Sequence, residues 1–284
     1  MLGVLFDGIA YGSLLFLVSL GLSVTMGLMN FVNLAHGAFA MVGGYVCVVA
    51  MTRFGVPFLA ALPLAFAITA AIGAVLERLL YRRLYGAAHL DQVLFSIGLT
   101  FMSIAAATYF FGSSQQPMRL PDFLRGQLHL GGVDFGIYRL FLIATVALLT
   151  AILGFLIART RFGAQVRASV DNAQAAKGLG INVDRVFSVA FALGSGLAGL
   201  GGALGIEVLG LDASFPLKFM VYFLLVVVVG GAGTIKGPLA AALLLGVLDV
   251  AGKYYVPQIG AFVIYGAMVV LQIAFPAGLF GRRR

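Results

Sequence analysis

Apolar stretches follow one another along nearly the whole chain, and short runs of glycine, proline and charged residues separate them. A helix needs roughly 20 mostly apolar residues to cross a hydrocarbon core about 30 Å thick. By this measure the pattern predicts about eight or nine membrane-spanning helices, so we expect an all-α, polytopic membrane protein. The predicted spans cover Val4–Leu28, His36–Met51, Pro57–Leu80, Val93–Phe111, Ile137–Ile157, Val186–Leu209, Phe219–Val229, Leu239–Gly252 and Ile259–Pro276.

Two segments interrupt this pattern, MNFVNLAHG at Met29–Gly37 and the glycine-rich GGAGTIKGP at Gly230–Pro238. The stretches on either side of the second segment are too short for a full crossing. Irregular backbone at membrane depth occurs where protein or a water-filled cavity satisfies its amides, and paired broken segments point to a transport pathway. We therefore expect broken or re-entrant hairpins here; the alternative is that Asn33 and His36 cap helices and the glycines only turn the chain. The predicted pathway residues are Asn30, Asn33, His36, Gly37, Gly230, Gly231 and Gly233.

A polar segment, Ala158–Val186, carries five of the 18 basic residues. Within it, the stretch from Gly163 to Lys177 is predicted to be one helix with a narrow apolar face. Arg167 and Asp171 lie four residues apart on the opposite side, where such pairs interact. The segment fits a helix on the membrane surface that docks into a partner; the alternative is a solvated linker. The apolar face is formed by Val166, Val170, Ala173 and Ala176, and the left-handed stop positions are Gly178 and Gly180.

The lysines and arginines set the expected orientation. If the polar segment faces the cytoplasm, eleven basic residues lie on that side and six on the other. Cytoplasmic loops carry the excess of basic residues, so we expect the N-terminus outside and the C-terminus in the cytoplasm. The net charge of +8 then reflects membrane topology, and no basic face suited to nucleic acid is evident.

Small residues recur every fourth position in the predicted span Val186–Leu209. Such stripes allow close helix packing in lipid and are expected to be structural. Ionisable groups inside spans are few, and the notable acids are Glu207 and Asp249, whose roles the sequence leaves open. The two stripes are Ala190, Gly194, Ala198 and Gly202, and beside them Ser195, Gly199 and Ala203.

Composition and motifs argue against an enzyme. Hydrophobic residues make up 62% of the chain and charged residues 10%, too little polar surface for a soluble domain of this length. The one cysteine and three scattered histidines suggest neither a disulfide nor a metal site. No phosphate-binding loop, zinc-protease motif, nucleophile elbow or dinucleotide fingerprint occurs. If ATP drives this protein, another chain must bind it.

Three segments, in order, resemble one family. Gly21–Tyr45, the polar segment and GGAGTIKGPLAAALLLG resemble branched-chain amino acid ABC transporter permeases of the LivH type, and the likeness runs from about Tyr11 to Gly281. It implies that residues 1–284 form one permease domain of the bacterial inner membrane. The implied partners are a second, LivM-like permease in a heterodimer, two ATP-binding cassette ATPases that bind ATP and Mg, and a periplasmic binding protein. No cofactor is expected in this chain.

The resemblance also implies which residues act. Asn33–Gly37 matches the family motif N-[FL]-A-H-G, with Leu34 where phenylalanine is commoner, and 158–186 becomes the segment that couples to the ATPases. Asp171, the neighbour of Arg167 on this segment, is also expected to take part in coupling. The implied coupling residues are Gly163, Arg167, Ala168, Ala176, Gly180 and Ile181.

The implied activity is alternating access driven by partner ATPases, with branched-chain amino acids or a related small polar solute as cargo. The binding protein is expected to dock on Gly112–Gly136. The competing hypothesis is a stand-alone channel or secondary transporter for a solute such as urea or an amide; a membrane-embedded enzyme comes third.

Overall fold

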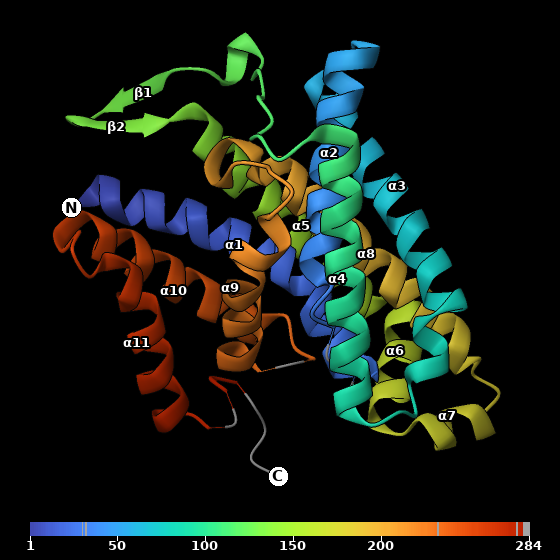
Figure 1. Cartoon of the computed structure of the whole chain (residues 1–284). Helices are drawn as coiled ribbons and strands as arrows, with labels where there is room; N and C mark the ends of the chain where they lie inside the picture. The colour runs from blue at the N-terminus through green and yellow to red at the C-terminus, as the bar shows by residue number, and fades with distance from the viewer. Residues whose placement is uncertain (30, 32, 232, 277, 281–284) are drawn as a thin grey trace.

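The computed structural model describes residues 1–29, 31, 33–231, 233–276 and 278–280. Within them the chain is almost entirely helical, which confirms the predicted all-α class (Figure 1). The helices are α1 (Leu2–Met29), α2 (His36–Phe54), α3 (Phe58–Leu79), α4 (His89–Phe111), α5 (Ile137–Arg159), α6 (Arg161–Asp171), α7 (Ala173–Gly178), α8 (Val183–Leu209), α9 (Phe215–Gly230), α10 (Lys236–Tyr255) and α11 (Gly260–Ala274), with short 3-10 turns η1 (Tyr81–Leu84) and η2 (Asp122–Leu124).

Among the described residues, seven helices are long and apolar enough to cross a membrane: α1 to α5, α8 and α10. The protein is therefore a multi-pass membrane protein, as predicted. Two further apolar helices are shorter, α9 with 16 residues and α11 with 15. The prediction of a short stretch at Leu239–Gly252 was wrong, because α10 begins at Lys236 and continues to Tyr255, giving 20 residues.

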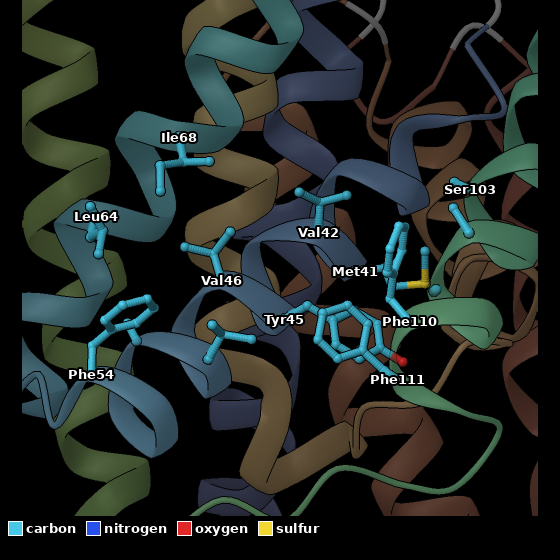
Figure 2. Close-up of a pocket in the computed structure, with 14 residues that line it drawn as sticks. Met41, Val42, Tyr45, Val46, Phe54, Leu64, Ile68, Ser103, Phe110 and Phe111 are labelled. Atoms are coloured by element: carbon cyan, nitrogen blue, oxygen red, sulfur yellow. The ribbon is translucent and has the colours of Figure 1, made fainter.

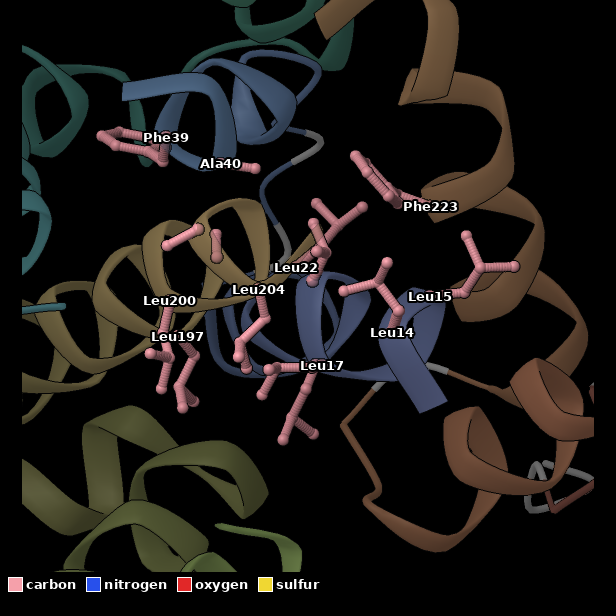
Figure 3. Packing of buried hydrophobic residues seen from close by; sticks show 14 of the residues in the cluster. Leu14, Leu15, Leu17, Leu22, Phe39, Ala40, Leu197, Leu200, Leu204 and Phe223 are labelled. Atoms are coloured by element: carbon pink, nitrogen blue, oxygen red, sulfur yellow. The ribbon is translucent and has the colours of Figure 1, made fainter. Parts of the chain in front are cut away.

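Helix α8 lies at the centre, packed between α1, α2 and α3. A Cβ atom at Gly43 would overlap the Gly199 backbone, one at Gly21 would overlap Gly194, and one at Gly202 would overlap the Ala40 carbonyl. Such close approach lets whole helix faces make van der Waals contact, the main attraction between helices in lipid. Leucines from α1 and α8 fill the adjacent space (Figure 3). The small-residue stripes are thus confirmed as packing surfaces.

A β-hairpin at one end of the molecule was not predicted. Strands β1 (Gln127–Leu130) and β2 (Val133–Gly136) pair antiparallel across Gly131 and Gly132, both with positive φ, as a tight hairpin turn requires. Phe135 of β2 packs edge-on against Phe6 near the start of α1. Helices α6 and α7 lie at the opposite end of the molecule (Figure 1).

Candidate functional site

The segment between α1 and α2 is held by polar groups that face other parts of the protein. Asn33 is 1% exposed, and its Oδ1 accepts hydrogen bonds from the Ala35 backbone N–H at 3.1 Å and the Tyr81 hydroxyl at 3.0 Å. The Asn33 side chain therefore stabilises the turn before α2, although it does not cap the helix, whose N-cap residue is Ala35. The predicted pathway residue Asn30 lies outside the described residues.

His36, the first residue of α2, is also buried. Its Nε2 donates to the Val18 carbonyl of α1 at 2.8 Å, because a carbonyl oxygen can only accept. The ring thus ties the start of α2 to the middle of α1. One residue on, a Cβ atom at Gly37 would lie 3.1 Å from the Pro216 Cα of α9, so glycine allows α2 and α9 to approach closely.

The glycine-rich segment after α9 docks onto the last turns of α1. The Gly233 N–H donates to the Ser23 carbonyl at 3.1 Å, and the Ser23 hydroxyl donates to the Thr234 carbonyl at 3.3 Å. Gly231 and Gly233 both have positive φ, which favours glycine. A Cβ atom at Gly230 would lie 2.6 Å from the carbonyl carbon of Gly237. The structure therefore brings both predicted segments to the C-terminal half of α1.

The polar segment contains two helices, so the prediction of one helix over Gly163–Lys177 was wrong. Asn172 has extended backbone angles, and its Oδ1 accepts from the Ala175 N–H at 2.9 Å, which caps α7. Asparagine side chains compete with helical backbone bonds in this way, so they favour caps over helix interiors. Thr160 caps α6 in the same manner, accepting from the Gly163 N–H at 3.1 Å.

Two glycines were predicted to end the helical segment in a left-handed conformation, and one of them does. Gly180 has a φ of +82° and ends the helical segment, as expected. Gly178 is instead the last residue of α7, and its φ is not in the left-handed region.

The side of α6 that faces the protein also differs from the prediction. Gly163, Val166 and Ser169 are buried, whereas Val170 is 43% exposed. Ala176 on α7 is buried as expected, and Ala168, Ala173 and Ile181 are half-buried. Because Ser169 carries a polar hydroxyl, a hydropathy pattern does not mark it as a buried position. The predicted apolar face of α6 therefore differs from the face that is buried.

Arg167 does not pair with Asp171, contrary to the prediction. Its guanidinium donates to the Ile157 carbonyl in the last turn of α5. Cationic groups are favoured there because the final carbonyls of a helix lack partners and carry partial negative charge. Gly163 lies against the same turn, since a Cβ atom there would overlap the Ile157 backbone. Within residues 158–186, the ion pair found is Lys177–Asp184, at 3.7 Å.

Helix α6 lines a cavity of about 30 Å³ together with α1 and the glycine-rich segment. Phe162 and Val166 of α6 line it together with Leu20 and Val24 of α1 and Ile235 from the glycine-rich segment. Val24 follows Ser23, whose backbone and hydroxyl hold that segment. A displacement of α6 would therefore change the space that it shares with α1 and Ile235.

A buried polar cluster at the end of α3 was missed by the sequence analysis. Glu77 is fully buried and accepts hydrogen bonds from the Ser188 hydroxyl at 2.6 Å, the Tyr85 hydroxyl at 2.8 Å and the Arg82 guanidinium at 3.3 Å. Hydrogen bonding to Glu77 raises the pKa of Arg82, and burial together with the Glu77 hydrogen bond raises the pKa of Tyr85. Both groups stay protonated at neutral pH and fix η1 to the first turns of α8. Tyr85 and Arg82 lie close to Glu77 in sequence, but nothing signals Ser188.

A larger groove lies elsewhere, between α2, α3 and α4 (Figure 2), with a volume of about 420 Å³. Tyr45 and Phe111 stack at its edge, with ring centroids 4.2 Å apart. Apolar side chains such as Val42, Leu64 and Phe110 form most of the wall, which does not suit a charged or zwitterionic solute.

The comparisons with known proteins agree with this architecture. BraD of Pseudomonas aeruginosa, a high-affinity branched-chain amino acid transport permease, is 28% identical over 98% of this chain and 95% of its own length. Escherichia coli LivH is 26% identical, covering 98% and 94%, and a probable LivH of Methanocaldococcus jannaschii is 25% identical, covering 95% and 87%. No solved structure matches the chain.

The family described as branched-chain amino acid transport system, permease component, matches residues 4–272, nearly the whole chain. This match includes the irregular segments, the α6–α7 pair and the central helix α8. The chain therefore belongs to the family of permease components of branched-chain amino acid transport systems, as the LivH-type resemblance predicted.

Proposed function

We propose that this chain is a permease subunit of a binding-protein-dependent ABC importer, and that it moves branched-chain amino acids across the bacterial inner membrane by alternating access. The family and its relatives support the class of cargo. The observation that carries the mechanism is the cavity that α6 shares with Val24 and Ile235, next to the Ser23–Gly233 hydrogen bond. A transport permease is not itself an enzyme, so ATP and Mg are assigned to partner subunits.

The two ends of the molecule suit different partners. At one end, α6 and α7 expose Arg161, Arg167 and Lys177, which fit a groove on an ATPase subunit in the cytoplasm. At the other end, the β-hairpin and the preceding loop expose polar groups such as Asp122 and Asp134 to a periplasmic binding protein. With this assignment we propose that the start of α1 lies outside and that the C-terminus is cytoplasmic, as the distribution of basic residues predicts. A second, LivM-like permease completes the pathway.

In this mechanism the two ATPases close on ATP and push α6. Because Thr160, Asn172 and Gly180 fix the ends of α6 and α7, the pair moves as two short rigid pieces and not as one long lever. The proposed coupling residues are Gly163, Arg167, Ala168, Asp171, Ala176, Gly180 and Ile181; of these, Gly163 and Ala176 are buried and position the segment without touching the ATPase. The push reaches α1 through Phe162 and Val166, and opens or closes the pathway beside Asn33, His36, Gly37, Gly230, Gly231 and Gly233.

Reconstitution tests this proposal. The chain would be purified with the second permease and the ATPases, placed in proteoliposomes, and supplied with the loaded binding protein. We expect leucine, isoleucine or valine uptake that requires ATP, Mg and the binding protein. Uptake that persists without ATP, or a chain that purifies without ATPase subunits, would support a channel or secondary transporter instead.

The irregular segment at Gly37 gives a first prediction about the pathway. Leucine at this position would press on Pro216, since even a Cβ atom lies 3.1 Å from its Cα, and would separate α2 from α9. We expect uptake to fall by about tenfold or more, the effect of misplacing groups by about 1 Å, while the ATPases remain bound. Gly154→Leu on α5 is the matched control, because no atom lies within 4 Å of a Cβ there. Normal uptake kinetics for Gly37→Leu would show that the segment is only structural.

A further inference from the structure

Asp249 on α10 is set apart from the other acids of this protein. Among the described residues, it is the carboxylate that is both buried, at 1% exposure, and more than one turn from either end of its helix. A buried ionisable group within a membrane span marks a substrate or ion site by default. By contrast, Glu207 lies near the end of α8 and is exposed.

The two carboxylate oxygens of Asp249 have different surroundings. Oδ2 accepts a hydrogen bond from the Lys253 ammonium at 2.6 Å. Oδ1 is buried and has no hydrogen-bond partner among the described residues. Buried polar atoms are nearly always hydrogen-bonded, so this oxygen is open to a donor from outside the chain. Such a donor would have to be small enough to enter between α1, α9, α10 and α11.

The groups around Asp249 suit both the positive and the negative end of a zwitterion. Lys253 is half-exposed, and its ammonium has three N–H donors, one of which donates to Asp249. Tyr11 on α1 lies beneath this ammonium, 5.7 Å from ring centroid to Nζ. Tyr222 on α9 lies near Tyr11 and Asp249, and Tyr265 on α11 lies near Tyr11 and pairs with Tyr222, with ring centroids 6.0 Å apart. The cluster thus offers a free acceptor, free cationic donors and aromatic walls.

We propose that Asp249, Lys253 and these three tyrosines form a transit site for an α-amino acid zwitterion. Asp249 Oδ1 accepts from the ammonium of the solute, Lys253 donates to its carboxylate, and the tyrosine rings pack against its aliphatic side chain. The neutral Asp249–Lys253 pair suits a ligand that has one charge of each sign and no net charge. The assignment rests on the proposed transport of branched-chain amino acids, and it adds to this chain a specificity site of its own.

The experiment uses the full complex in proteoliposomes with leucine-loaded binding protein. Asp249→Asn keeps the shape but removes the acceptor charge, and we expect leucine uptake to fall by about tenfold or more, the effect of losing one charged hydrogen bond. Glu207→Gln, the matched loss of an acid, should stay within about twofold. Binding-protein-stimulated ATP hydrolysis in the same vesicles checks assembly. Uptake by Asp249→Asn at the rate of the unaltered complex would overturn the assignment.

A purely structural ion pair gives a different pattern. If the pair only stabilises α10, the double variant D249N/K253Q should recover uptake, because no unpaired charge remains. A solute site predicts that the double variant stays as low as Asp249→Asn. Should Asp249→Asn fail to assemble, Lys253→Gln decides the matter, since Lys253 is half-exposed, and unchanged uptake by that variant would overturn the site.

The headgroup of phosphatidylethanolamine is also a zwitterion, so the measurements are made in vesicles with and without this lipid. The site predicts the same defect in both, whereas a defect confined to phosphatidylethanolamine vesicles would assign the cluster to lipid. If the unaltered complex takes up no branched-chain amino acid, the proposed function itself fails. Uptake by the unaltered complex with normal variants removes only the transit site.

Discussion

Replacing Gly202 by leucine is expected to remove the folded protein from the membrane. Gly202 lies where α8 crosses α2, and a Cβ atom there would overlap the Ala40 carbonyl and lie 2.9 Å from the Ala40 Cα. The obstacle is backbone, so no side-chain rotation can relieve it, and the helices must separate. Overpacking costs about 1–3 kcal/mol where side chains can adjust, and we expect a larger loss here. The amount of intact protein in purified membranes, and its resistance to protease, measure the effect.

Gly98→Leu on α4 is the control for this prediction. It makes the same change within a predicted span, but no atom lies within 4 Å of a Cβ at Gly98. We expect it to accumulate at the level of the unaltered chain. Equal accumulation of Gly202→Leu would mean that α2 and α8 do not cross at this point.

The fold was largely predictable because hydropathy and residue size act locally. Lipid selects long apolar runs, and these appear in the sequence at nearly their observed positions. Close helix crossings select small residues at every fourth position, which identified α8 as a packing helix before its neighbours were known. The length of α10 escaped the pattern because Lys236 and Tyr255 lie at its ends, where polar groups can reach water.

The candidate site was less predictable because its contacts join distant parts of the chain. The segments around Asn33 and Gly233 were found, but not their joint attachment to α1. Ser188 reaches Glu77 across 111 positions, so no spacing rule could pair them. Within the polar segment, one asparagine side chain decided between one helix and two. Local propensity alone slightly disfavours asparagine within a helix, and the cap at Asn172 becomes clear only from its backbone angles.

The second large effect is expected for Arg167→Glu. The unaltered guanidinium donates to the Ile157 carbonyl, and so holds α6 against the end of α5. A glutamate removes the donor and places negative charge beside carbonyls that are already partly negative. Because Arg167 is exposed, the stability loss should be only about 1 kcal/mol. We expect ATP hydrolysis to continue while amino acid uptake falls by about tenfold or more, the effect of misplacing groups by about 1 Å.

Arg161→Glu separates the hydrogen bond from the charge. It makes the same change in charge on the same helix, but Arg161 is exposed at the first turn of α6, where a carboxylate is favoured. If α6 acts by being held against α5, Arg161→Glu should keep coupled uptake. If the ATPase instead recognises the positive charge of this surface, both variants should lose coupled uptake equally. Normal uptake in Arg167→Glu would contradict either mechanism, because α6 would then transmit nothing to Val24 and the glycine-rich segment. Loss confined to Arg167→Glu would place the decisive contact at the α5–α6 corner, where Gly163 and Arg167 meet the same carbonyl.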